Sequence, residues 1–140
     1  MLDLKKLVIL EKEEFLSLPE TVEKKERNGR GLKSALQLTD EKLDDYLYES
    51  YKKFMVEMIV ELDHANMGDP RAQRIVGGTI LKGHLVGVDV DKEQGIEYLE
   101  LAAKQDDSAA AFELYGFYKE SDPEKAKLYR DIYLGKGAER

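Results

Sequence analysis

Residues 68–107 read GDPRAQRIVGGTILKGHLVGVDVDKEQGIEYLELAAKQDD, and this stretch decides the fold. It opens on Asp69 and Pro70, a favourable helix start, because aspartate can cap free N–H groups and proline has no N–H to leave unsatisfied. Residues suited to a buried face then recur at helical spacing, namely Ala72, Ile75, Val76, Thr79 and Ile80. The sequence therefore predicts a helix with one buried face.

A second helix is predicted after a loop that contains Gly83 and Gly87. Asp91 is placed to cap it, and Gln94 is placed three residues later to complete a capping box. Its inward stripe is formed by Ile96, Leu99 and Ala103. Because Ala102 and Ala103 are small, we expect another helix to approach closely here.

Two glycines, Gly77 and Gly78, lie inside the first predicted helix. Each costs about 1 kcal/mol relative to alanine at such a position. They do not follow a strand, and no Gly-Lys-Ser or Gly-Lys-Thr sequence accompanies them, so a phosphate-binding loop is not indicated. We expect instead that another helix packs against this point.

The pattern starts again at Asp107. Ala110, Leu114 and Tyr118 repeat the spacing of Ala72, Val76 and Ile80. The run DPEKAKLYRDIY from Asp122 parallels DKEQGIEYLELA from Asp91. The offset matches the length of a two-helix repeat, so we expect a clear repeat at 68–107 and a partial repeat at 107–137.

This segment resembles the Sel1-like repeat, a relative of the tetratricopeptide repeat. The matching residues occur in the family's order: Gly68-Asp69, Ala72-Gln73, Gly77, Gly83, Gly87-Val88, Asp91, Ile96, Tyr98-Leu99, Ala102-Ala103, Gln105 and Asp107. Two extra residues lie between Gly83 and Gly87, and Gly95 stands where the family prefers alanine. The resemblance implies an all-α fold, a short α-solenoid of antiparallel helix pairs whose surface binds other proteins.

The regions before the repeat are assigned by the same reasoning. Residues 40–66 are expected to form one long helix or two abutting helices, capped by Asp40, so that 40–140 is the repeat region. Residues 1–39 are expected to cap this region within a single compact domain. A helix from Pro19 is expected to stop near Asn28-Gly29, a common turn dipeptide. Residues 5–10 could form a strand or a helical turn.

Composition limits the partners and the chemistry. The net charge of −7 argues against nucleic acid, whose phosphates would repel the chain, and it suits a basic protein. No segment is apolar enough over sufficient length to span a membrane, no secretory cleavage pattern is present, and the chain has no cysteine. We therefore expect a cytoplasmic protein. Neither His64 nor His84 has metal-ligand spacing, and no cofactor is expected. The oligomeric state is left open.

Candidate binding residues gather on the long predicted helix. A tyrosine beside carboxylates is a plausible hot spot for a basic surface. Tyr46 and Tyr48 cannot both face the core, because they lie two residues apart on a helix. The candidates on this helix are Asp44, Asp45, Tyr48, Glu49 and Tyr51, and those on the repeat are Arg74, Phe112 and Tyr115.

The sequence contains no convergent set of catalytic residues, so a non-enzymatic protein-binding module is expected. A short, acidic chain with barely two repeats suits an inhibitor or immunity protein that neutralises a basic toxin domain, as the resemblance to bacterial Sel1-like proteins implies. The alternative is a general Sel1-like adaptor or scaffold in a signalling or assembly pathway. An enzyme is a third and weaker possibility.

Overall fold

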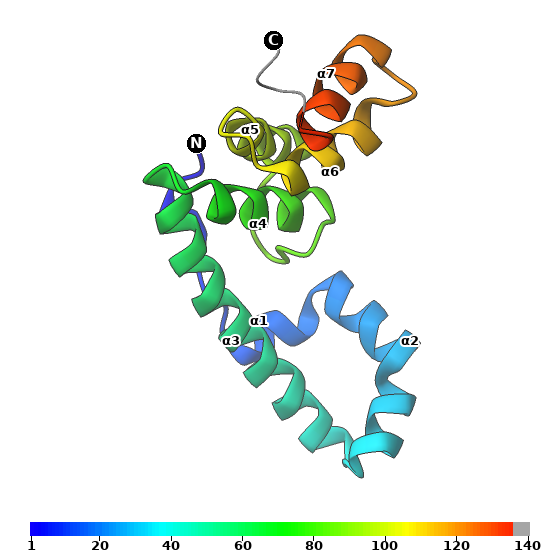
Figure 1. The fold of residues 1–140 in the computed structure, drawn as a ribbon. Helices are drawn as coiled ribbons and strands as arrows, with labels where there is room; N and C mark the ends of the chain where they lie inside the picture. Colours follow the sequence, from blue (N-terminus) through cyan, green and yellow to red (C-terminus); the bar gives the residue numbers. More distant parts are fainter. Residues whose placement is uncertain (136–140) are drawn as a thin grey trace.

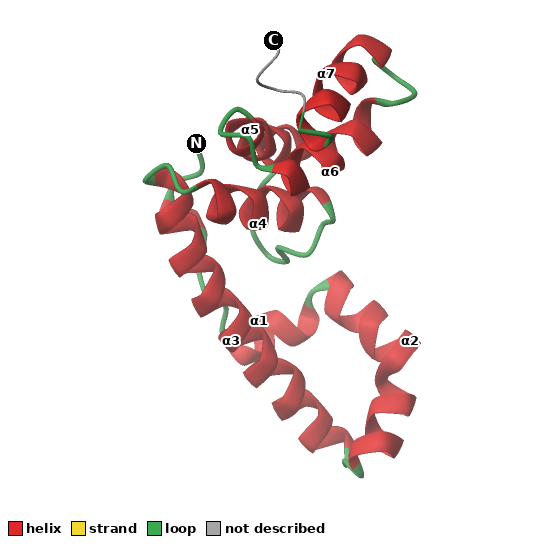
Figure 2. Ribbon diagram, viewed as in Figure 1, coloured by secondary structure: helices red, strands yellow, loops and turns green. Residues whose placement is uncertain are grey.

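The computed structural model describes residues 1–135, and this part of the chain consists of helices and loops without a strand (Figures 1 and 2). The elements are η1 (Leu4–Lys6), α1 (Lys12–Ser17), α2 (Pro19–Leu36), α3 (Asp40–Asn66), α4 (Pro70–Leu81), α5 (Lys92–Ala103), α6 (Ser108–Tyr118) and α7 (Pro123–Tyr133). The predicted all-α class is confirmed. The last two positions of the expected partial repeat, 136 and 137, lie outside the described residues.

Helices that are consecutive in the chain pack against one another from α3 to α7. Figure 1 shows α4 to α7 gathered at one end of α3, with α1 and α2 beside its other end. One apolar cluster joins the N-terminal segment, α1, α3 and α4, and a second joins α5, α6 and α7. Among the described residues, no helix combines the length and the apolar character that crossing a membrane requires.

Each helix from α4 to α7 begins with an aspartate that caps it. The side chains of Asp69, Asp91, Asp107 and Asp122 each accept a hydrogen bond from a backbone N–H in the first turn. Asp91 and Gln94 form the expected capping box. Each cap is worth about 1 kcal/mol, so these four residues both define the helix starts and stabilise them.

Helices α4 and α5 approach each other closely at a pair of glycines. A Cβ atom added to Gly77 would lie 2.7 Å from the carbonyl oxygen of Gly95, and one added to Gly95 would lie 2.9 Å from that of Gly77. The two backbones therefore touch. This contact explains the expected packing at Gly77. It also explains Gly95, where alanine would not fit.

Small residues serve the same purpose between α5 and α6. Ala102, Ala103, Ala110 and Ala111 have no exposed surface and lie in one cluster. The expected close contact at Ala102 and Ala103 is confirmed. α7 is tied to α5 by the Tyr129 hydroxyl, which donates to Glu100 Oε2 at 2.7 Å.

The N-terminal region differs from the prediction in two helices. α2 continues through Asn28-Gly29 to Leu36, so the expected turn is wrong. Gly29 is buried, and a Cβ atom added there would lie 3.4 Å from Leu43 of α3. The helix ends at Leu36, and its C-cap, Gln37, has a φ of +55°. α3 is one continuous helix, and its N-cap is Thr39 rather than Asp40.

The segment before α1 also takes a definite form. Residues 4–6 make a single 3-10 turn, and the residues that follow run to α1 without pairing as a strand. The helical turn is therefore the correct alternative for the first part of this segment, and the strand is not formed.

Because α4 and α5 touch at Gly77 and Gly95, replacing glycine with alanine should change the free energy of unfolding in opposite directions at Gly77 and at Gly116. Gly77→Ala should lower the free energy of unfolding by about 1–3 kcal/mol, because overpacking exceeds the gain in helix propensity. Gly116→Ala is the matched control, since a Cβ there meets no atom within 4 Å, and it should raise stability by about 0.5–1 kcal/mol. Urea unfolding measures both. Equal stabilisation by the two substitutions would contradict the contact.

Candidate functional site

The two candidate tyrosines of α3 bind the N-terminal segment of the same chain. The Leu10 N–H donates to the Tyr51 hydroxyl at 2.9 Å, and the Tyr48 hydroxyl donates to the Leu10 carbonyl at 2.8 Å. Tyr51 is only 6% exposed, and burial raises its pKa, partly offset by the bond from Leu10. The exposed tyrosine of this helix is Tyr46, at 44%. Of these three, Tyr46 is the most exposed, Tyr48 is half-buried and Tyr51 is buried.

The candidate carboxylates beside these tyrosines are paired with lysines. Asp44 Oδ1 lies 2.6 Å from Lys25 Nζ of α2, and Glu49 Oε1 lies 2.9 Å from Lys52 Nζ. Asp45 pairs with Lys12 of α1, and this bond is the main cause of the raised pKa of Lys12. The negative charge of this cluster is therefore largely neutralised within the molecule.

The remaining candidates lie on the other half of the molecule. Arg74 Nε of α4 lies 3.2 Å from Asp107 Oδ1, so this arginine joins α4 to the capped start of α6. Tyr115 is half-buried against the second apolar cluster. Phe112 is 53% exposed, and its ring centroid lies 5.0 Å from that of Tyr133. Figure 1 places α6 far from the first half of α3, so the eight candidates do not form one site.

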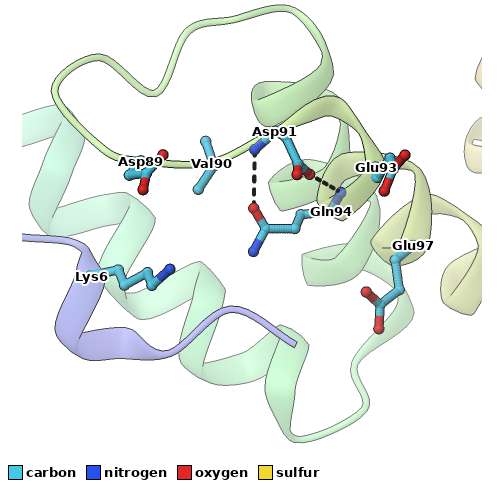
Figure 3. A pocket seen from close by; sticks show the side chains of 7 residues that line it. All are labelled: Lys6, Asp89, Val90, Asp91, Glu93, Gln94 and Glu97. Atoms are coloured by element: carbon cyan, nitrogen blue, oxygen red, sulfur yellow. Dashed lines mark hydrogen bonds between the residues drawn. The ribbon is translucent and has the colours of Figure 1, made fainter.

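A pocket at the start of α5 is lined by carboxylates (Figure 3). Unlike the candidate carboxylates of α3, they form no ion pair with a lysine of the described residues. It has a volume of about 370 Å³ and is lined by Lys6, Asp89, Val90, Asp91, Glu93, Gln94 and Glu97. Asp89 and Glu93 have no ion-pair partner among the described residues, and Glu97 lies 4.0 Å from the N-terminal amino group. Four carboxylates thus share this pocket with Lys6, and the N-terminal amino group lies beside Glu97. This pocket suits a positively charged side chain.

The capping box holds two of the lining residues in place. Asp91 Oδ1 accepts from the Gln94 N–H at 3.0 Å, and Gln94 Oε1 accepts from the Asp91 N–H at 3.0 Å (Figure 3). Glu93 and Glu97 follow one helical turn apart on α5. Within residues 1–135, no group of three or more histidine, aspartate or glutamate side chains is arranged to hold a metal ion.

The N-terminal segment brings Lys6 to the pocket. At its start, the Leu2 N–H donates to the Tyr98 hydroxyl at 2.8 Å, and Asn66 Nδ2 donates to the Leu2 carbonyl at 2.9 Å. At its end, Tyr48 and Tyr51 hold Leu10. Both ends of the N-terminal segment are therefore attached to the helices by side chains that hydrogen-bond to the backbone of the segment.

Comparison with protein-family models, with curated proteins and with solved structures yields no match for this chain. Function is therefore inferred from its own residues. The sequence identified Asp91 as a helix cap but did not connect it with Lys6, because about 80 residues separate Lys6 from this loop and only the fold brings them together. The spacing of Glu93 and Glu97 was the one available signal.

The tyrosine contacts predict that replacing tyrosine with phenylalanine lowers the free energy of unfolding more at Tyr51 than at Tyr46. Tyr51→Phe should lower the free energy of unfolding by about 1–2 kcal/mol, because the half-buried Leu10 N–H loses its partner. Tyr46→Phe is the matched control on the exposed side of α3 and should change stability by less than about 0.5 kcal/mol. Thermal unfolding compares the two. A Tyr51→Phe variant as stable as the control would show that the hydrogen bond between Leu10 and Tyr51 does not stabilise the fold.

Proposed function

We propose that this chain is a non-enzymatic protein-binding module, built as a short solenoid of Sel1-like helix pairs. Two features support the solenoid. The pairs α4–α5 and α6–α7 begin at corresponding aspartate caps, and Ala72 and Ala110 occupy equivalent buried positions in the first helix of each pair. Short solenoids of this kind offer their surfaces to partner proteins.

Several residues of the Sel1-like pattern have structural roles that suit such a repeat. Gln73 is buried, and its Nε2 donates to the Ala65 carbonyl at the end of α3. Gln105 Nε2, beyond the end of α5, donates to Gln73 Oε1 at 2.9 Å. These bonds link the ends of α3 and α5 through α4. They support the interpretation that the Sel1-like residues are present because they pack the helices of the repeat together.

Within this class we favour a small acidic inhibitor or immunity protein that binds and neutralises a basic toxin domain in the cytoplasm. The observation that carries this choice is the pocket at the start of α5, where Asp89, Asp91, Glu93 and Glu97 surround a space open to a lysine or arginine side chain. The net charge of −7 would steer a basic partner toward the molecule. The paired carboxylates of α3 would contribute less.

The direct experiment is capture of the partner from the native host, identification by mass spectrometry and titration of the purified pair. A triple variant Asp89→Asn, Glu93→Gln and Glu97→Gln should raise Kd by about tenfold or more, since it removes the charge that receives the cation. Asp91 is left in place because it caps α5. Association should also slow with added salt, as the Debye length falls from about 10 Å at 0.1 M to about 3 Å at 1 M.

The matched control is the triple variant Glu26→Gln, Glu57→Gln and Glu120→Gln, which changes the net charge equally on exposed residues away from the pocket. It should weaken binding much less than the pocket variant. A basic partner whose toxic activity is blocked supports the immunity role, and a partner without such activity favours the adaptor. An acidic partner, or equal effects of the two triple variants, would contradict the proposal.

A further inference from the structure

A second hollow lies between α2, α3 and the loop that joins α4 to α5. It has a volume of about 500 Å³ and is open to solvent. Its floor is apolar and is formed by side chains of α1 and α3, chiefly Phe15, Leu47, Tyr51 and Phe54. Most of its lining residues belong to α2 and α3, so it is a groove between these two helices. It does not include the carboxylates at the start of α5.

The helix on one side of this groove is poorly packed for its length. α2 has 18 residues but buries only Thr21 and Gly29, whereas α4 has 12 residues and buries six. Most helical stability in proteins comes from packing one face against other elements, because isolated helices are marginal in water. The inner side of α2 therefore has room for a further element.

The charge of the groove is opposite to that of the molecule. Lys24 and Arg27 lie almost one turn apart on α2 and both line it. Lys24 has no ion-pair partner among the described residues, and Arg27 meets only the exposed Glu23, at 3.4 Å. Glu20 is the one carboxylate in the lining. In a chain of net charge −7 this local excess of positive charge favours an acidic ligand.

We propose that this groove binds an amphipathic helix of a partner protein. Large apolar side chains of that helix lie on Phe15, Leu47 and Phe54, and a carboxylate on its flank meets Lys24 and Arg27. This is the helix-in-groove mode of recognition, in which one helix face supplies apolar anchors at i, i+3 and i+4. The surface differs in position and in charge from the pocket at the start of α5, so it is a second binding surface beyond the proposed function.

The test is a selection of helical peptides from a phage-displayed library on the intact protein, with fluorescence anisotropy of the selected peptides. We expect peptides with apolar residues at i, i+3 and i+4 and with aspartate or glutamate on the flank. Ser50→Trp should abolish their binding by filling the groove, since Ser50 is an exposed lining residue of α3. Lys24→Glu with Arg27→Glu should raise Kd by about tenfold or more.

The control for charge is Lys119→Glu with Lys127→Glu, an equal change of net charge on exposed residues near and on α7. It should leave peptide binding within about twofold, allowing for long-range charge. Circular dichroism establishes that each variant is folded, and the triple variant at the start of α5 should bind the peptides normally. Basic or unpatterned peptides, or peptides insensitive to Ser50→Trp, would overturn the proposal. So would a dimer of the protein that Ser50→Trp dissociates, because a second copy would then occupy the groove.

Discussion

The contact between Gly77 and Gly95 is the constraint on which the packing of the repeat depends. Because neither residue has a Cβ, the backbones of α4 and α5 touch, and any side chain at either position would push them apart. α3 packs on α4 and α6 packs on α5. The distance between α4 and α5 therefore also determines how far apart α3 and α6 lie. The low helix propensity of glycine, about 1 kcal/mol per residue, is the cost of this arrangement.

The carboxylates of this chain have different roles according to their position. Those at the start of α3 pair with lysines of α1 and α2, and they help attach this N-terminal region to the long helix. Exposed pairs of this kind are worth only about 0–1 kcal/mol each, so their larger effect is to cancel local charge. Asp89 and Glu93, near the start of α5, lack such partners among the described residues, and Lys24 and Arg27 of α2 line the groove. A chain of one overall sign therefore presents surfaces of both signs.

Local signals in the sequence predicted the repeat well. Aspartate caps, helical periodicity and small residues act within one or two turns, so they located α4 to α7 and the contact at Ala102 and Ala103 correctly. Asn28-Gly29 misled the prediction because turn propensity is local, whereas Gly29 lies at a buried position of α2, near Leu43 of α3. Tyr51 was chosen as a binding residue because nothing local shows that the N-terminal segment covers it. The pocket with Lys6 could not be predicted, since its residues are distant in sequence.

We expect α4 and α5 to be the most tightly held part of the described chain and α2 to be its most loosely held helix. Native-state hydrogen exchange of the whole protein, followed by mass spectrometry, tests this most directly because local opening energies reflect local burial. We predict the slowest exchange in the amides of α4 and α5, around Gly77 and Gly95, and fast exchange along α2. Protection of α2 equal to that of α4 would contradict the account, since it would mean that α2 is fully packed and that the two glycines do not mark the centre of the fold.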